Sequence, residues 1–448
     1  MIVLTATDAH DRSINFARAL TERGVRPGSR VAIVTPEQDP ESRIPQGQAA
    51  TVTLVLAILR MGAVPVMINA LLTEAERDYI VSDARAALVI TGADAMVTLE
   101  KEGSGPVPEL ADHPLGRPMH YTSGTTGRPK GVYAPLSESE ARDWWLDEQQ
   151  QWGFCESDLT LVHSPLCHSA PLRFALATIG AGGAVALAGR FDPTRISRAI
   201  QHLRPTTAFT VPTQLNLLIR RPGGLPRSTY RLLAHAGSSC PPSVKRAVHA
   251  WVGADRVWEF YGSTEGQFTS CRGTEWERHE GTVGRARPGR TITVDSDGTI
   301  WCEPPSFGRF EYWDDPQRTS QAWRVTPTGR AFTVGDVGHR DNEGYVYLNG
   351  RREDLIISGG VNVYPAEVEQ VLSQCPGVHE VAVYAQPSDR WGQTVCVAYV
   401  GGATETDLRQ WATANLAAFK RPKVWTRVQH LPRNTMGKVR YQDLPGRE

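Results

Sequence analysis

Tyr121-Thr-Ser-Gly-Thr-Thr-Gly-Arg-Pro-Lys-Gly-Val132 is the stretch on which the interpretation of the chain depends. Four Ser or Thr residues and two glycines fall within seven positions, and Arg128 and Lys130 follow them. The N–H and hydroxyl groups of such a loop can surround a polyphosphate, and glycines allow its close approach. The spacing differs from a Walker A loop, which requires Gly-Lys-Ser/Thr. A flexible surface loop has the same composition, so the choice depends on partners elsewhere in the chain.

Length and charge narrow the class of protein. The chain has 448 residues, too many for one ordinary core, so we expect two or more structural units. Its 40% hydrophobic and 21% charged residues are typical of a soluble globular protein. Lys+Arg and Asp+Glu both number 48, so we expect neither nucleic acid nor an anionic membrane as partner.

Location is indicated by what the sequence lacks. The apolar run Thr51–Leu59 is too short to span a bilayer, and the N-terminus has no basic segment typical of a signal peptide. Seven cysteines form no CxxC pair and are odd in number, so we expect reduced thiols, neither zinc ligands nor a disulfide framework. We therefore expect a cytoplasmic protein.

Strand and helix alternate in the first part of the chain. Short β-branched runs at 30–35, 63–68 and 86–91 predict strands, and helices are expected at 10–24, 49–62 and 73–84. Continuous apolar strands predict a parallel sheet covered on both faces. Residues 93–118 are rich in Gly, Pro and acids, and we expect them to form a connection.

The second part repeats this pattern and then changes. Alternating strands and helices are expected over 159–261, with helices at 193–203 and 212–219. In contrast, 281–347 has short β segments and many prolines, which predict an antiparallel, barrel-like region. The remainder indicates an α+β domain of about 100 residues. We expect an α/β fold in which a large domain of stacked αβ sheets and a barrel-like subdomain occupies 1–352 and a small α+β domain occupies 353–448.

Two further turns carry acidic side chains. Tyr261-Gly-Ser-Thr-Glu-Gly266 follows an expected strand end, where Glu265 could hold Mg²⁺ against phosphates. Thr333-Val-Gly-Asp336 is a tight turn whose acid could accept two ribose hydroxyls. Taken alone, each acid is more often a solvated turn residue or a turn cap.

Together these segments resemble the adenylate-forming superfamily of acyl- and aryl-CoA synthetases, luciferases and peptide-synthetase adenylation domains. The resemblance covers nearly the whole chain, with five segments in the family's order and spacing: Tyr121–Val132, Tyr261–Gly266, Thr333–Asp336, Gly350–Pro365 and Pro432-Arg-Asn-Thr-Met-Gly-Lys438. It implies a small C-terminal domain that is mobile and carries a catalytic lysine. Most relatives have about 30–40 more residues before the first helix, so we expect a shortened start to the large domain.

The resemblance also implies roles by position. The phosphate-binding loop would comprise Thr122, Ser123, Gly124, Thr125, Thr126, Gly127 and Lys130. Thr126 and Glu265 would lie near Mg²⁺, and Thr264 precedes that glutamate in the nucleotide site. The segments around adenine would be Gly237 and Ser238 with Glu259, Phe260, Tyr261 and Gly262. Asp336 and Arg351 would contact the ribose, and Lys438 would bridge the attacking oxyanion and the α-phosphate.

These roles answer a physical need. A weak oxyanion nucleophile must meet a highly charged nucleotide, so cations and donors must offset the charge that develops at phosphorus. The resemblance implies ATP, Mg²⁺ and CoA as cofactors and co-substrates, and a small-molecule acid as the substrate. We expect a monomer or homodimer.

The segment between the two domains departs from the family pattern. Glu353 stands where relatives usually have Asp or Lys as a hinge. Ser358–Tyr364 follows it and matches the turn that lines the pantetheine tunnel in CoA ligases. The hinge function of Glu353 remains open at this point.

The expected acid pocket is polar. His168 matches the family's aromatic gate residue and is counted with Thr126, Glu265 and Lys438 as catalytic. No Asp occurs between Asp158 and Asp192, which argues against an α-amino acid substrate. The surrounding His, Ser and Cys residues favour a small or functionalised acid over a long alkyl chain.

Three functions remain open. The first is an ATP-dependent ligase that forms an acyl-AMP and then a CoA thioester. The second keeps the adenylation chemistry but changes the acid or acceptor, either loading a carrier protein or activating nitrite for diazotization of an aryl amine. The third is a non-catalytic nucleotide-binding relative, against which the presence of Glu265, Asp336, Arg351 and Lys438 argues.

Overall fold

The computed structural model describes residues 1–122, 129–351, 354, 356–358, 361–388, 392–416, 418–434 and 437–446. Ser123, Gly124, Thr125, Thr126 and Gly127 of the expected phosphate loop lie outside these residues, as does Glu353 at the expected hinge. In the part that is described, no helix combines the length and apolar composition needed to cross a bilayer.

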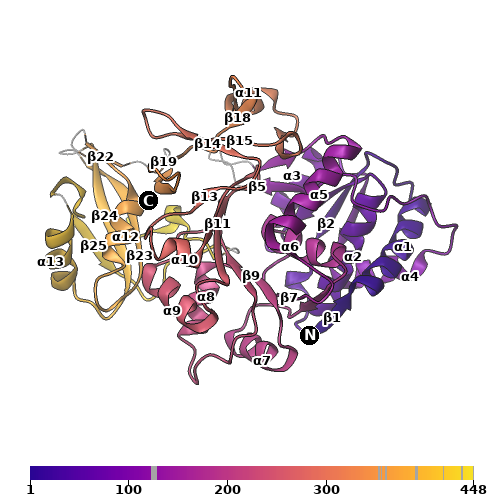
Figure 1. Ribbon diagram of the computed structural model, residues 1–448, viewed down its shortest axis with the longest axis horizontal. Coiled ribbons are helices and arrows are strands. Elements are labelled where there is room, and N and C mark those ends of the chain that lie inside the picture. The colour runs from indigo at the N-terminus through magenta and orange to yellow at the C-terminus, as the bar shows by residue number, and fades with distance from the viewer. Residues whose placement is uncertain are drawn as a thin grey trace.

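A six-stranded sheet forms the indigo end of the molecule (Figure 1). Its strand order is β16-β6-β5-β3-β2-β4. Strands β5, β3, β2 and β4 are parallel to one another, β6 pairs antiparallel with β5, and β16 pairs antiparallel with β6. The strands are β2 (Arg30–Val34), β3 (Val64–Ile68), β4 (Leu88–Thr91), β5 (Met119–Thr122), β6 (Lys130–Tyr133) and β16 (Glu311–Tyr312).

An eight-stranded sheet follows, in the order β1-β8-β7-β9-β10-β11-β12-β13. Its five middle strands are parallel, while β1 at one edge and β12 and β13 at the other are antiparallel. The strands are β1 (Ile2–Thr5), β7 (Leu159–Val162), β8 (Ala184–Leu187), β9 (Thr207–Thr210), β10 (Leu232–His235), β11 (Val257–Gly262), β12 (Gln267–Arg272) and β13 (Arg285–Ala286).

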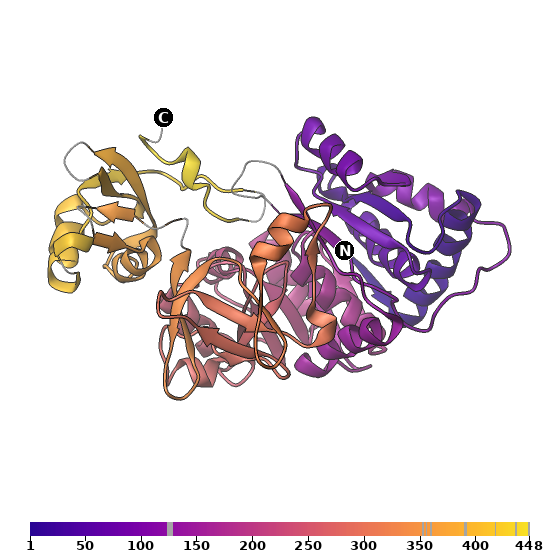
Figure 2. The same ribbon diagram turned by 90° about the horizontal axis from the view of Figure 1, so that it is seen from above.

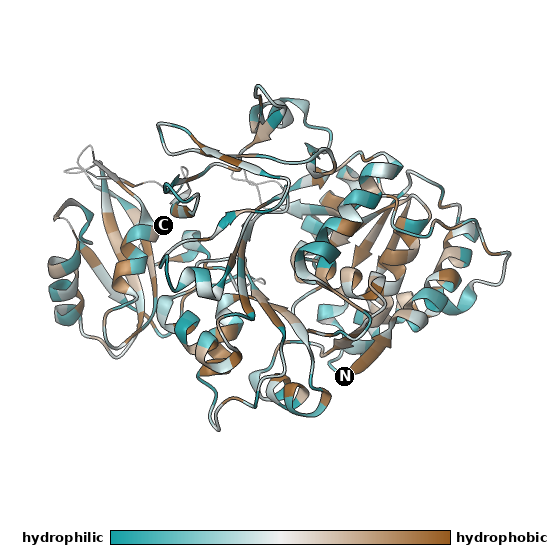
Figure 3. Cartoon of the chain, viewed as in Figure 1, coloured by the Kyte–Doolittle hydropathy of each residue, from teal (hydrophilic) through white to brown (hydrophobic). Residues whose placement is uncertain are grey.

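Helices fill the space between the two sheets and cover their outer faces. One continuous core joins α1, α2, α4 and α6 to strands of both sheets, and nearly every residue of α2 is buried within it. Figure 3 shows the hydrophobic residues gathered on the strands beside these helices. The helices of this part are α1 (Ala6–Glu22), α2 (Ile44–Arg60), α3 (Glu74–Asp83), α4 (Gly92–Glu102), α5 (Glu138–Trp152), α6 (Ser169–Gly180), α7 (Pro193–Leu203), α8 (Pro212–Ile219), α9 (Pro242–Val252), α10 (Gly273–Trp276) and α11 (Pro316–Ala322).

The expected α/β class is confirmed, but three local predictions were wrong. The expected connection 93–118 contains α4, whose Ala93, Met96 and Leu99 are buried at a spacing of three. The first helix begins at Ala6, because Thr5 caps it through Asp8, and a strand precedes it. The sheet in the first part of the chain, expected to be parallel, is mixed, because β6 and β16 pair antiparallel at one edge.

The antiparallel region is a four-stranded sheet joined to a hairpin. Its order is β14-β15-β18-β17, and an isolated bridge between Thr299 and Val337 connects it to the β19–β20 pair. The strands are β14 (Thr291–Val294), β15 (Ile300–Glu303), β17 (Trp323–Val325), β18 (Arg330–Phe332), β19 (Asp336–Arg340) and β20 (Val346–Arg351). Bulky side chains such as Phe268, Phe310 and Phe332 form its core.

The C-terminal part has its own sheet and core. Strands β22, β21, β24 and β23 pair antiparallel in that order, and β25 pairs parallel with β24. They are β21 (Ile356–Ser358), β22 (Val361–Val363), β23 (Val378–Ser388), β24 (Gly392–Gly401) and β25 (Val424–Arg427), with helices α12 (Pro365–Leu372) and α13 (Glu405–Asn415). Figure 2 shows this yellow unit beside the rest, with its last segment extending back toward it. The boundary at 352/353 stays a prediction.

Candidate active site

The two residues expected at the ribose lie opposite each other. Asp336 opens β19, and its Cα is the register partner of Arg351 at the end of β20. Tyr261, at the end of β11, donates a hydrogen bond from its hydroxyl to Asp336 Oδ2 at 2.6 Å. Three segments distant in the sequence therefore meet at one point, as the resemblance implies.

Glu265 is held by a tyrosine that sequence analysis did not single out. Its side chain lies in the β11–β12 turn, the residue is 5% exposed, and Tyr312 donates a hydrogen bond to its Oε1 at 2.9 Å. Lys130 Nζ lies 4.2 Å from the centre of the same Tyr312 ring. Strand pairing between β16 and β6 creates this contact, so no local pattern around Tyr312 predicts it.

The expected adenine segments separate into two kinds of residue. Gly237 has φ +97°, a conformation that favours glycine, and Ser238 follows it in the loop after β10. Glu259 instead pairs with Lys245 Nζ at 2.6 Å, and Phe260 packs in an aromatic cluster with Trp152. Side chains of Glu259 and Phe260 are thus engaged in the core, so an adenine contact there would use their backbone.

Polar groups are found at Thr122, where the expected phosphate loop begins, and in the β11–β12 turn. Thr122 ends β5, and its Oγ1 is buried without a hydrogen-bond partner in the part of the chain that the structure describes. Gly262 and Thr264 lie in the β11–β12 turn beside Glu265; a Cβ at Gly262 would approach Gly266 O to 2.9 Å. A buried hydroxyl without a partner among the described residues can donate to a bound oxyanion.

The C-terminal lysine reaches the large unit. Gly437 O accepts a hydrogen bond from Thr213 Oγ1 at 3.4 Å, and Arg433 Nη1 donates to the same hydroxyl at 3.4 Å. Thr213 belongs to α8, so the loop that carries Lys438 is docked on that helix. The backbone N–H of Lys438 donates to Asn434 Oδ1, which closes the loop on itself.

His168 lies within electrostatic reach of this lysine. It is the residue before α6, and its Nε2 is buried without a hydrogen-bond partner among the described residues. Burial, and then the charge of Lys438, lower the pKa of His168 to about 4. The imidazole is therefore neutral at pH 7, and the charge of one expected catalytic residue acts on another that lies far earlier in the chain.

A small cavity adjoins this place. Its volume is about 40 Å³, and it is lined by Ser169 and Arg173 of α6, Thr264 and Gln267 of the β11–β12 segment, and residues of α5 and the segment before β5. The lining includes Arg117, Pro118, His120, Val132, Trp144, Asp147, Glu148, Leu172, Gly266, Arg290, Pro304, Phe307 and Gly308. Sequence analysis assigned no role to these arginines.

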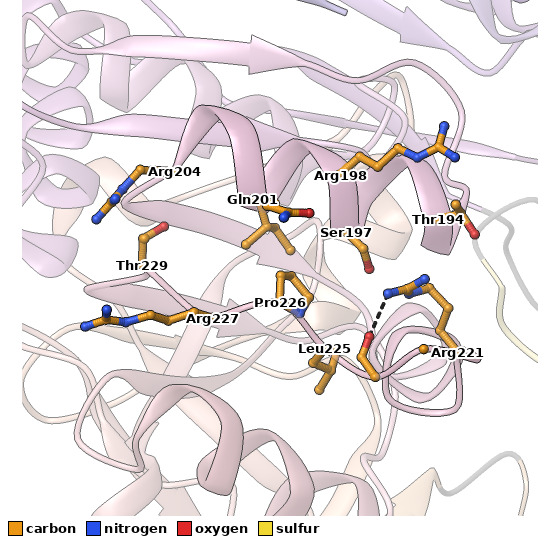
Figure 4. A pocket seen from close by; sticks show the side chains of 13 residues that line it. Thr194, Ser197, Arg198, Gln201, Arg204, Arg221, Leu225, Pro226, Arg227 and Thr229 are labelled. Carbon is orange, nitrogen blue, oxygen red and sulfur yellow. Dashed lines mark hydrogen bonds between the residues drawn. The ribbon is translucent and has the colours of Figure 1, made fainter.

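A larger groove lies away from these residues. It has a volume of about 560 Å³ and runs between α7 and the loop that follows α8 (Figure 4). Four arginines line it: Arg198, Arg204, Arg221 and Arg227. None of the residues expected at the nucleotide site belongs to its lining, so its greater size does not make it the candidate active site.

Comparison with known proteins identifies the family. Residues 2–301 match the AMP-binding enzyme family, and residues 367–438 match the AMP-binding enzyme C-terminal domain. The 4-chlorobenzoate–CoA ligase of Pseudomonas sp. (strain CBS-3) is 30% identical over 467 residues, 93% of this chain and 86% of that enzyme.

Two solved structures give the same answer. ATP-bound MatB from Rhodopseudomonas palustris has a TM-score of 0.82 and 29% identity, over 97% of this chain and 91% of that one. The amide bond synthetase McbA from Marinactinospora thermotolerans has a TM-score of 0.82 and 26% identity, over 97% and 92%. The resemblance deduced from the motifs is confirmed: this chain belongs to the AMP-binding enzyme family, within the adenylate-forming superfamily.

Proposed function

We propose that the protein is an ATP-dependent, AMP-forming ligase that adenylates a small acid, releases pyrophosphate and transfers the acyl group to CoA. Relatives named as CoA ligases support this reaction for the family. The observation that supports it is the docking of the Lys438 loop on α8, together with the effect of the Lys438 charge on His168. A non-catalytic nucleotide-binding protein would not need that contact.

Each site residue has its own proposed role in the first step, the adenylation of the acid. Asp336 and Arg351 are proposed to hold the ribose, and Lys130 with the phosphate loop to hold the terminal phosphates. Lys438 would then offset the negative charge that develops at the α-phosphorus. Because His168 is neutral, it adds no second charge to that centre and is suited to shape the approach of the acid.

A metal ion fits this arrangement. Glu265 offers a carboxylate held by Tyr312, the hard oxygen ligand that Mg²⁺ prefers when phosphates supply the remaining ligands. Among the described residues no group of three or more His, Cys, Asp or Glu could hold a metal. When bound, Mg²⁺ would stabilise the departing pyrophosphate.

The test is pyrophosphate release over a panel of acids, with and without CoA. We expect Lys438→Ala to slow release by much more than tenfold, whereas Lys423→Ala, an exposed lysine of the same unit, leaves it within twofold. A Lys438→Ala rate within tenfold of the unaltered enzyme, about 1.4 kcal/mol, would disprove the role of that lysine. If no acid of the panel yields an acyl-CoA, thioester formation is disproved.

A second candidate function changes the acceptor to an amine. The similarity to an amide bond synthetase favours it, because that neighbour has the same fold over almost the whole chain. Nitrite activation for diazotization of an aryl amine and loading of a carrier protein use the same first step. Adding an aryl amine, with a carboxylic acid or with nitrite, to the assay without CoA distinguishes them: consumption of the amine supports this candidate, and unchanged amine contradicts it.

A further inference from the structure

The small cavity beside the active site has an unbalanced charge. Three guanidinium groups line it, from Arg117, Arg173 and Arg290, against two carboxylates, from Asp147 and Glu148. The histidine in its wall adds no charge, because burial first and then nearby cations lower the pKa of His120 to about 3. Among the side chains that line the cavity, one positive charge is therefore in excess.

The two carboxylates form ion pairs with particular arginines. Asp147 accepts both terminal nitrogens of Arg290, at 2.6 and 2.8 Å, and one from Arg287 at 3.1 Å. Glu148 lies 3.4 Å from Arg287 Nη2, and its other oxygen lies 3.6 Å from Arg173 Nε. The acids thus neutralise Arg290 and Arg287 better than they neutralise Arg173.

Three arginines of the cluster have buried nitrogens without a hydrogen-bond partner among the described residues: Nη2 of Arg117, Nε and Nη2 of Arg173, and Nε and Nη1 of Arg287. Arg287 is nevertheless paired with both carboxylates. The same residues give Arg173 only one ion pair, the 3.6 Å contact with Glu148, although its side chain is only 10% exposed. Arg117 forms no ion pair with the described residues, although the charge of Glu265 acts on it. A buried guanidinium without an acceptor is costly unless something else supplies one.

The size of the cavity limits what can supply it. A volume of about 40 Å³ corresponds to roughly three water-sized positions, at 10–15 Å³ each. A planar O–X–O group, such as a carboxylate or nitrite, has this size and accepts two hydrogen bonds from a guanidinium. An aryl ring or an alkyl chain is larger and offers no acceptor.

The cavity is also in the right place. Ser169 follows His168 directly, and Thr264 and Gly266 flank Glu265. A ligand in the cavity would therefore lie against residues that are next in the sequence to the expected gate, His168, and to the expected metal ligand, Glu265.

We propose that Arg117 and Arg173 bind a compact oxyanion in this cavity, and that the enzyme is therefore specific for acids that present one. This rests on the proposed function and names its substrate class. The anion is either the whole acid, as with nitrite or formate, or the second carboxylate of a dicarboxylic acid whose first is adenylated. Acids that end in an uncharged alkyl or aryl group are excluded.

Binding of the anions alone tests the site without catalysis. In calorimetry with nitrite, formate and succinate, we expect saturable binding of at least one anion to the full chain. The binding should weaken at least 30-fold in Arg117→Met and in Arg173→Met, less in Arg117→Lys, and not in Arg227→Met from the open groove. Binding of none of the three, or equal binding by all variants, overturns the proposal whatever the enzyme catalyses.

Pyrophosphate release then distinguishes the two sources of the anion. Nitrite or formate as the best substrate indicates that the whole acid fills the cavity. Succinate preferred over butyrate by about 100-fold or more indicates the second carboxylate, and this preference should collapse in Arg117→Met while the KM for ATP stays within twofold. Butyrate used as well as succinate and nitrite overturns the specificity but leaves the ligase function standing.

Discussion

Two cavities of this molecule are lined by arginines, but the arginines of one are exposed to water and those around the other are buried beside carboxylates. In the large groove Arg198, Arg204 and Arg227 are exposed, and no arginine of the groove forms an ion pair with the described residues. Around the small cavity, Arg287 is fully buried and Arg290 is 6% exposed, and both contact Asp147.

Water explains the difference. A guanidinium at the surface keeps its hydration and needs no carboxylate, whereas a buried one must be paired or pay a large desolvation cost. The buried cluster provides acids for some of its arginines but leaves Arg117 and part of Arg173 without an acceptor. An unpaired charge therefore carries information about a ligand only where water is excluded.

The largest expected effect follows from breaking the buried pairs. Although burial raises it, the charges of Arg173 and Arg287 hold the pKa of Glu148 below its usual range, so the group is charged. Glu148→Gln removes that charge and leaves both arginines poorly neutralised, so we expect the free energy of unfolding to fall by about 3 kcal/mol or more. Urea denaturation at pH 7 measures it.

The matched control is Arg204→Gln in the open groove, for which we expect a change of no more than about 0.5 kcal/mol. Equal losses in the two variants would contradict the comparison, because burial would then make no difference.

A half-buried acid that has no cationic partner among the described residues offers a third solution, which is to keep its proton. Burial raises the pKa of Glu369 in α12 to about 7 from an ordinary value of 4.5. The folded state thus binds a proton that the unfolded state loses between these values, so stability falls as the pH rises from about 4.5 to 7 and is level above. We expect a loss of up to about 3 kcal/mol across this range.

Denaturation of the unaltered protein and of Glu369→Gln at pH 5 and 8 tests this expectation. The variant has no proton to lose, so its stability should change less between the two pH values. A steeper pH dependence in the variant would show that Glu369 is charged in the folded state.

The smallest expected effect is that of the Lys438 charge on the pKa of His168. Lys438 is the second cause, after burial, of the lowered pKa of His168. We expect Lys438→Ala to raise the pKa of His168 by less than one unit, measured by NMR of labelled histidine. Arg227→Ala should leave it unchanged; a fall in either variant would contradict the docking of the lysine loop.

Local motifs explain why much of this site could be predicted. Gly237 and Gly262 occupy positions where backbone conformation or close contact requires glycine, and such constraints are visible in sequence. The same holds for helices that begin at a proline, such as α7 and α8, whose predicted bounds agree with the structure. Helix α4 was missed because its flanking Gly and Pro residues outweighed a clear apolar spacing.

The rest depended on tertiary contacts. Tyr312 reaches Glu265 only because a two-residue strand pairs with β6. Arg117 and Arg173 are ordinary arginines by sequence, and only the fold reveals which nitrogens lack acceptors. Thr213 likewise has no signal that marks it as the docking point of the lysine loop. The roles assigned to individual site residues, and the loop Ser123–Gly127 itself, stay predictions.

That docking point also sets a time scale. Among the described residues, two hydrogen bonds join the lysine loop to α8, both long and both through the Thr213 hydroxyl. Bonds of this kind contribute about 1 kcal/mol each, so thermal motion would break these two many times within a turnover of roughly 0.1 s. Under the proposed function, Thr213 would fix where the lysine loop docks but not how long it stays, so that one short loop could serve one step and be absent for the next.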